Sequence, residues 1–125
     1  MSLRTPISKV KGLGPAKEGV NHWIMQRLTA IALVPLVFWF IYTIIKASMS
    51  GVIFPVLTSP FSAIAMILFL STAFYHGSLG MRVVIEDYIH CSVSKVVLII
   101  LVNFTSIILG VGSVLAVIKA HLGAA

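Results

Sequence analysis

The sequence carries very little charge. Asp, Glu, Lys and Arg make up 10% of its 125 residues, and only three residues are acidic. A typical soluble domain has about 25% charged residues, and so short a chain exposes most of its surface. Because 59% of the residues are hydrophobic and the mean hydropathy is +1.10, a soluble globular domain and a disordered chain are both excluded. The remaining class is a small, single-domain, all-α integral membrane protein.

Cysteine and catalytic motifs are also scarce. Cys91 is the single cysteine, which excludes an internal disulfide, a zinc finger, iron–sulfur ligation and covalent c-type haem attachment by this chain. The sequence contains no Ser-His-Asp set, no pair of catalytic carboxylates and no glycine-rich phosphate loop. We therefore expect that the chain is not a catalyst by itself.

Three long apolar runs dominate the sequence, at residues 28–45, 61–85 and 96–118. The shortest would reach about 27 Å as an α-helix, close to the roughly 30 Å of a bilayer core. The pattern therefore predicts three transmembrane helices. Pro35 lies in the middle of the first run and predicts a kink, which transmembrane helices tolerate when neighbouring groups satisfy the freed carbonyl.

The segments outside these runs are more polar. Residues 1–27 include Gly12, Gly14 and Pro15, which disfavour a regular helix, so we expect an extended arm on the cytoplasmic or matrix side. The first apolar run starts too late and is too long for a cleaved signal peptide, which predicts that the arm is retained. Residues 86–92 are expected to form a short polar loop. The membrane anchor then covers residues 28–119, and residues 120–125 form a tail.

The basic residues lie mostly on one side of the predicted membrane. If the N-terminal arm is cytoplasmic, seven of the nine Lys and Arg residues fall on that side. The seven are Arg4, Lys9, Lys11, Lys17, Arg27, Arg82 and Lys95, and the other two are Lys46 and Lys119. This asymmetry predicts a cytoplasmic N-terminus in a bacterial inner membrane, with the mitochondrial inner membrane as the alternative, and contact with anionic lipids. Because no basic stripe alternates with aromatic residues, nucleic acid is not an expected partner.

His76 is the most informative polar residue inside the predicted spans. It lies sixteen residues after Pro60, or about 24 Å into the membrane, where polar side chains are costly and usually face other helices or a cavity. The position suits either a neutral histidine bonded to a neighbouring helix or an axial ligand to haem iron. Gly77 and Gly80 favour the haem ligand, since Gly80 is one turn from His76 and leaves room for a flat macrocycle. The same glycines could instead serve close helix packing.

A second polar cluster lies at the cytoplasmic end of the second span. Asp87 and Tyr88 follow His76 by eleven and twelve residues, so a continuous helix would keep them near the same face, about 16 Å away. The Tyr88 hydroxyl could donate a hydrogen bond to the carbonyl of a ring-shaped ligand, or Tyr88 could be an ordinary interfacial tyrosine. Arg27 is expected at the same level. It could pair with Asp87 or Glu86, bind a propionate or a quinone, or simply extend to the membrane surface.

These residues resemble a known family. Residues 76–88, HGSLGMRVVIEDY, are similar to the H-x3-G-M-x5-D-Y motif of the D-type membrane anchor subunits of succinate dehydrogenase, and residues 22–30 resemble the start of that family's first helix. Arg82 also fits the H-x3-G-x-R pattern of the C-type anchors. That type usually has His-Arg where this chain has Gln26-Arg27, and it lacks the Asp-Tyr pair, so the D-type resemblance is the stronger one. It covers nearly the whole chain past residue 20.

The resemblance implies a membrane anchor that acts with a second, C-type anchor subunit to hold a flavoprotein and an iron–sulfur subunit. It implies a b-type haem shared between the two anchors, with His76 as an axial ligand to the iron and Arg27 near the haem propionates and the quinone pocket. It also implies a ubiquinone site, in which Tyr88 bonds the quinone carbonyl beside Asp87. Electrons from succinate would then pass through the iron–sulfur subunit to quinone, linking the tricarboxylic acid cycle to the respiratory chain.

Two other functions remain open from the residues alone. The chain could be a small homo-oligomeric transporter with three spans per subunit, or a cofactor-free structural subunit of a respiratory complex. A transporter needs an ionisable residue deep in the membrane, and only His76 qualifies. The uncharged polar residues of the third span, Asn103, Thr105 and Ser106, are expected to form hydrogen bonds between helices.

Overall fold

The computed structural model describes residues 16–50 and 59–123. These residues form three α-helices, α2 (Ala16–Ser50), α4 (Pro60–Tyr88) and α5 (Ser92–Gly123), and no strand occurs among them. Each of the three helices is long and apolar enough to cross a membrane. The all-α, three-span fold predicted from the apolar runs is confirmed.

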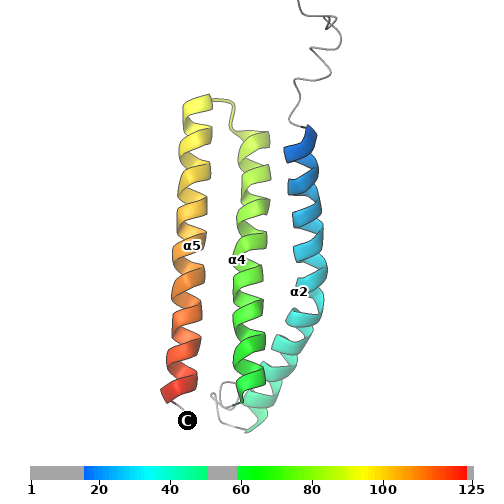
Figure 1. Cartoon of the computed structure of the whole chain (residues 1–125), viewed down its shortest axis with the longest axis vertical. Helices are drawn as coiled ribbons and strands as arrows, with labels where there is room; N and C mark the ends of the chain where they lie inside the picture. The colour runs from blue at the N-terminus through cyan, green and yellow to red at the C-terminus, as the bar shows by residue number, and fades with distance from the viewer. Residues whose placement is uncertain (1–15, 51–58, 124–125) are drawn as a thin grey trace, which may run out of the picture.

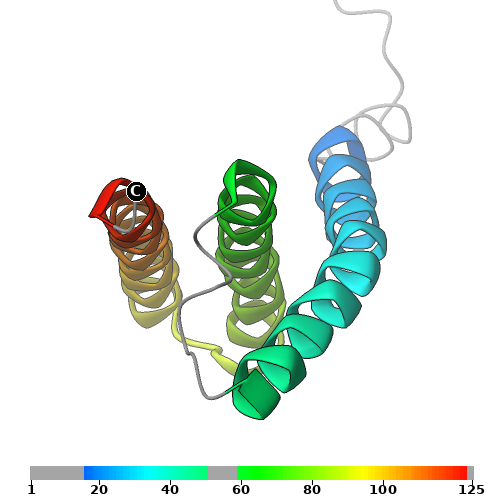
Figure 2. The ribbon, with the colours of Figure 1, turned by 90° about the horizontal axis from the view of Figure 1, so that it is seen from below.

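α4 is the central helix of the molecule. It packs against α2 on one side and α5 on the other, whereas α2 and α5 do not contact each other within the described ranges. The helices stand side by side in a row (Figure 1), and α4 lies between α5 and the first half of α2 when viewed along the helices (Figure 2). Both faces of this row consist largely of exposed apolar side chains, which suits contact with lipid or with another membrane subunit.

Each outer helix turns one stripe of half-buried residues toward α4. The stripe on α2 recurs at intervals of three and four residues, which is the spacing of one helix face. It comprises His22, Gln26, Thr29, Leu33, Leu36, Phe40 and Thr43. Phe40 stacks on Phe69 of α4, with ring centroids 4.7 Å apart. On the other side, Gly110 of α5 lies against the Phe74 ring of α4, so a small residue lets these two helices approach closely.

The helices extend beyond the apolar runs that predicted them. The predicted spans 28–45, 61–85 and 96–118 compare with helices at 16–50, 60–88 and 92–123. The expected extended arm is therefore wrong for residues 16–27, which are helical, while residues 1–15 lie outside the described ranges. The ends of an apolar run mark where side chains leave the bilayer. Backbone hydrogen bonding continues beyond them through Lys, Glu, Gln and Arg, which are good helix formers.

The predicted polar loop at 86–92 is also mostly helical. α4 continues to Tyr88, where the Ile89 N–H bonds the Ile85 carbonyl at 3.0 Å and closes the last turn. Lys95 Nζ donates to the Glu86 carbonyl at 3.0 Å, and so satisfies a carbonyl that a helix end otherwise leaves without a partner. Only residues 89–91 separate α4 from α5.

Proline and serine shape the other helix ends and the course of α2. Ser59 caps α4 by accepting a hydrogen bond from the Ser62 N–H at 3.2 Å, and Pro60 occupies the first helical position, both favoured at a helix start. α2 continues through Pro35 and bends toward α4 in the half that follows it (Figure 1). Proline has no N–H to bond the carbonyl one turn back, so this bend agrees with the predicted kink.

Candidate functional site

His76 of α4 contacts α2 in the middle of the membrane-spanning region. Its ring nitrogen Nδ1 lies 2.8 Å from the hydroxyl oxygen of Thr29 on α2, and both residues are half-buried. The other ring nitrogen, Nε2, makes no hydrogen bond to the residues that the structure describes. The expected bond from His76 to a neighbouring helix is therefore present, and it leaves one imidazole nitrogen for a different ligand.

Thr29 belongs to a polar seam, which we define as His22, Gln26 and Thr29 on α2 together with His76 on α4. His22 Nε2 and Gln26 Oε1 are buried and have no hydrogen-bond partner among the described residues, an arrangement that is uncommon for buried polar atoms. The sequence analysis did not identify Gln26 and Thr29 as part of the site. Their spacing from His22, at i+4 and i+7, was the available signal, because those positions share one helix face.

The two glycines beside His76 have different surroundings. A Cβ placed on Gly80 would lie 3.5 Å from Gln26 Nε2, whereas a Cβ on Gly77 would meet no atom within 4 Å. Gly80 therefore lies at the contact with α2, where an added Cβ would make ordinary contact with the Gln26 side chain. The open space next to His76 lies at Gly77.

The contact between Thr29 and His76 also shows where Arg27 lies along the helix axis relative to His76. The two helices run in opposite directions (Figure 1), and Arg27 precedes Thr29 by two residues, so it lies about 3 Å along the axis from the level of His76. Asp87 lies about 16 Å from His76 along α4. The prediction that Arg27 lies level with Asp87 is wrong, because α2 begins well before its apolar run.

The predicted ion pairs of Arg27 are absent from the described residues. Its guanidinium lies over the Trp23 ring, 4.7 Å from the ring centroid, a favourable cation–π arrangement. Glu86 pairs with Arg82 instead, at 2.8 Å and one turn away on the same helix. Arg27 consequently stays on an exposed face of α2, at about the level of His76, without a carboxylate partner in this part of the chain.

Asp87 and Tyr88 form the last turn of α4. They lie at the end of the molecule where α2 begins and α5 begins (Figure 1). Tyr88 is 76% exposed, and its hydroxyl makes no hydrogen bond to a described residue. Asp87 is also exposed and forms no ion pair in the described ranges. Both side chains are therefore accessible to a ligand or to another subunit at this end.

The chain does not build a closed metal centre from its described residues, since no group of three or more His, Cys, Asp or Glu side chains lies close enough to hold an ion. A haem iron requires less, because a single imidazole nitrogen is a sufficient axial ligand from one side. The free Nε2 of His76 and the open space at Gly77 fit that requirement.

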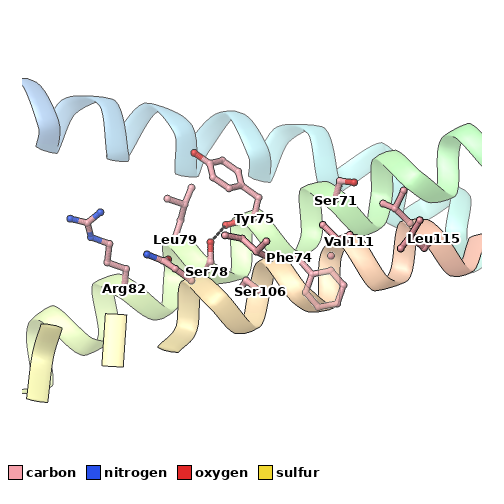
Figure 3. Close-up of a pocket in the computed structure, with 13 residues that line it drawn as sticks. Ser71, Phe74, Tyr75, Ser78, Leu79, Arg82, Ser106, Val111 and Leu115 are labelled. Atoms are coloured by element: carbon pink, nitrogen blue, oxygen red, sulfur yellow. Dashed lines mark hydrogen bonds between the residues drawn. The ribbon is translucent and has the colours of Figure 1, made fainter. Parts of the chain in front are cut away.

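A groove of about 680 Å³ lies between α4 and α5. Its walls are mostly apolar, and polar groups from Ser71, Ser78 and Arg82 on α4 and from Ser106 on α5 interrupt them (Figure 3). No pattern in the sequence indicated this groove. Asn103 and Ser106 line it, and neither they nor Thr105 forms a hydrogen bond to another helix within the described residues.

Together, the fold and the site define a class: a small multi-pass membrane subunit with a ligand-competent histidine at a helix interface and an exposed Asp-Tyr pair at one end. The chain belongs to the family described as succinate dehydrogenase/fumarate reductase transmembrane subunit, which it matches over residues 1–111. The family resemblance identified from residues 76–88 is thereby confirmed.

Individual relatives agree with the family match. Succinate dehydrogenase hydrophobic membrane anchor subunits are 41% identical in Rickettsia bellii (92% of this chain, 94% of the relative), 35% identical in Rickettsia prowazekii (92% and 94%) and 29% identical in Paracoccus denitrificans (99% and 97%). No solved structure gives a significant match. The three spanning helices and these relatives identify a multi-pass protein of the bacterial inner membrane. The transporter and the cofactor-free subunit are not favoured.

Proposed function

We propose that this chain is the hydrophobic membrane anchor subunit of a succinate dehydrogenase. The observation that carries the proposal is the 41% identity, over nine-tenths of both chains, to a relative with that name. In this role α2, α4 and α5 form half of the membrane domain, and a second, C-type anchor subunit forms the other half. The iron–sulfur and flavoprotein subunits then bind at the end where α4 meets α5, on the side that carries most of the basic residues.

His76 is the residue that we propose as an axial ligand to a b-type haem shared between the two anchors. Three features support this role: its depth in α4, its unbonded Nε2, and the open space at Gly77. The haem iron, when bound, accepts and donates one electron. Arg27 lies within about 3 Å of the level of His76 along the helix axis, on an exposed face of α2, and its guanidinium has the fork of donors that would hold a haem propionate.

Tyr88 is the residue that we propose for binding ubiquinone. Its hydroxyl can donate a hydrogen bond to a quinone carbonyl while its ring remains in the membrane interface. Asp87 adds a negative charge beside it and so influences the local field and proton supply. Because Arg27 lies about 15 Å from Tyr88 along the helix axes, we assign Arg27 to the haem and not to the quinone headgroup.

Purification through an affinity tag on this chain tests the proposal. We expect two larger soluble subunits and a second small membrane subunit to co-purify, with a b-type haem in the reduced-minus-oxidised spectrum. His76→Ala should abolish or alter that spectrum because it removes a strong-field nitrogen ligand. His121→Ala is the matched control, since His121 lies in the last turn of α5, at the end opposite the proposed subunit contacts.

Two results would contradict the proposal. Absence of the soluble subunits from the wild-type preparation would reject the anchor function. An unaltered haem spectrum and haem content in an intact His76→Ala complex would reject His76 as the ligand while leaving the anchor function in place.

A further inference from the structure

We infer that Thr29 is a positioning residue that fixes the tautomer of His76. Its hydroxyl holds the imidazole with the proton on Nδ1, so that Nε2 keeps the free electron pair that a metal ligand needs. The inference rests on the proposed function, in which His76 is a haem ligand. It concerns a different residue on a different helix, and it can fail while that function stands.

The protons around Thr29 can be counted from three distances. Thr29 Oγ1 lies 2.7 Å from the Met25 carbonyl oxygen, 2.8 Å from His76 Nδ1 and 3.1 Å from the Gln26 carbonyl oxygen. A hydroxyl group has one proton to donate and two electron pairs that can accept. The two carbonyl oxygens can only accept, so any proton between Thr29 and a carbonyl must come from Thr29.

The shortest of these contacts, between Thr29 Oγ1 and the Met25 carbonyl oxygen, determines which atom donates the proton in each hydrogen bond. If the Thr29 hydroxyl donated to His76, its oxygen would face the Met25 carbonyl oxygen at 2.7 Å with no proton between them, and two acceptors at that distance repel. If it donates to Met25, the Gln26 carbonyl at 3.1 Å is the weaker second acceptor of the same proton, and only the contact with His76 needs a proton from the ring. The protons then run from His76 Nδ1–H to Thr29 Oγ1, and from Thr29 Oγ1–H to the carbonyl of Met25.

This chain has two consequences for the ring. When a ligating imidazole donates a hydrogen bond from its other ring nitrogen, that bond fixes the orientation of the ring and raises its basicity as a ligand. The apolar surroundings strengthen both the bond from His76 to Thr29 and the bond from Thr29 to Met25. A more basic ligand favours oxidised over reduced haem iron. Thr29 should therefore lower the haem reduction potential although it lies on α2, outside the motif that contains His76.

The same helix offers a matched control. Thr43 Oγ1 donates to the Trp39 carbonyl at 2.7 Å and is half-buried like Thr29, but it has no histidine partner among the described residues. Thr43→Val and Thr29→Val therefore remove the same hydroxyl and the same backbone bond from α2. Only Thr29→Val removes the hydrogen bond to the imidazole.

The experiment is a potentiometric titration and an EPR spectrum of the haem in the purified complex. In Thr29→Val we expect the ratio of reduced to oxidised haem at a fixed ambient potential to rise, by at most roughly tenfold, which would require the whole free energy of one hydrogen bond to distinguish the two oxidation states. The low-spin EPR signal should also shift, since the ring is no longer held. Thr29→Ser, which keeps the hydroxyl, should remain close to wild type, and Thr43→Val should match it. Loss of haem in Thr29→Val with retention in Thr29→Ser would equally support the inference.

The outcomes separate this inference from the proposed function. A wild-type potential and EPR signal in Thr29→Val would overturn the positioning role, as would an equal shift in Thr43→Val. If His76→Ala loses the haem in the same preparation, the ligand assignment survives that failure. If His76→Ala leaves the haem unchanged, the ligand assignment itself has failed, whatever Thr29→Val shows.

Discussion

Few polar side chains lie within the apolar helices of this molecule, so the loss of a single polar interaction can have a large effect on its stability. The Arg82–Glu86 pair is half-exposed at the end of α4, and such pairs contribute about 0–1 kcal/mol. The Thr29–His76 hydrogen bond lies far from both helix ends, where an unpaired polar group has no water to turn to. Loss of the deep hydrogen bond should therefore matter more than loss of the charged pair.

Tyr88→Phe tests the quinone site at the level of one hydroxyl group. The substitution keeps the ring and removes only the donor, and a lost hydrogen bond to a neutral partner costs about 0.5–1.5 kcal/mol, or roughly twofold to tenfold in quinone affinity. We expect quinone reduction to fall, while succinate oxidation with an artificial acceptor that bypasses the site stays near the wild-type rate. Steady-state assays of the purified complex with both acceptors measure this.

Tyr42→Phe is the control for that substitution. Tyr42 is also exposed, but it lies in the second half of α2, toward the end of the molecule opposite Tyr88. Wild-type quinone reduction in Tyr88→Phe would mean that Tyr88 is the wrong residue. Equal losses with both acceptors would indicate defective assembly instead of a lost hydrogen bond.

The sequence indicated some of these residues and not others, for a physical reason. His76 is an isolated imidazole in an apolar run, so it was identifiable from the chain alone. Thr29 and Gln26 were not, because their importance depends on the register between α2 and α4, which no local pattern encodes. The level of Arg27 was misjudged for the same reason.

At the scale of the helices, Gly110 of α5 is a small residue at the contact with α4. A Cβ on Gly110 would lie 3.8 Å from Phe74 Cβ and 3.9 Å from Cδ2, which is ordinary contact, whereas a Cβ on Gly112 would meet nothing within 4 Å. Gly110 thus tolerates one added carbon, but a longer side chain would overlap the Phe74 ring.

The corresponding prediction compares three substitutions by thermal unfolding of the purified complex. Gly110→Ala should be neutral or slightly stabilising, since alanine fits and restricts the unfolded chain. Gly110→Leu should destabilise by about 1–3 kcal/mol, the usual cost of overpacking. Gly112→Leu should leave the α4–α5 contact unchanged. A wild-type melting temperature for Gly110→Leu would show that the two helices can separate without cost.

Helix ends illustrate the limit of prediction at this scale. The apolar runs located all three helices and placed the start of α4 within one residue, but they placed the other five ends 3 to 12 residues inside the helices. Hydropathy reports on the bilayer, while a helix ends where a cap such as Ser59 or a capping carbonyl contact such as Lys95 to Glu86 replaces the backbone bonds.

At the scale of the whole molecule, the distribution of basic residues predicts that the α4–α5 connection faces the cytoplasm. The natural Cys91 lies there and is exposed. Hydrogen bonds from the Ser94 backbone N–H, the Ser94 hydroxyl and the Val93 N–H lower the pKa of its thiol by stabilising the thiolate. Cys91 should therefore react with maleimides readily near neutral pH, with a half-maximal rate at a lower pH than an ordinary cysteine.

Labelling with a membrane-impermeant maleimide measures the orientation directly. Cys91 should be modified in inverted membrane vesicles and protected in intact spheroplasts. Leu122→Cys in a Cys91→Ser background should show the reverse, since Leu122 is 72% exposed near the opposite end of α5. Detergent-solubilised samples provide the reference for full labelling. Modification of Cys91 in intact spheroplasts would contradict the orientation.

The central position of α4 has a consequence for how the protein is made. Among the helices that the structure describes, contacts join only those that follow one another along the chain, α2 with α4 and α4 with α5. During synthesis, each helix is therefore followed directly by the helix that it packs against, so packing can proceed in the order in which the helices are made. A nascent chain that has left the translocon as far as Tyr88 already holds both partners of the Thr29–His76 bond, so the histidine can be oriented before α5 has been synthesised.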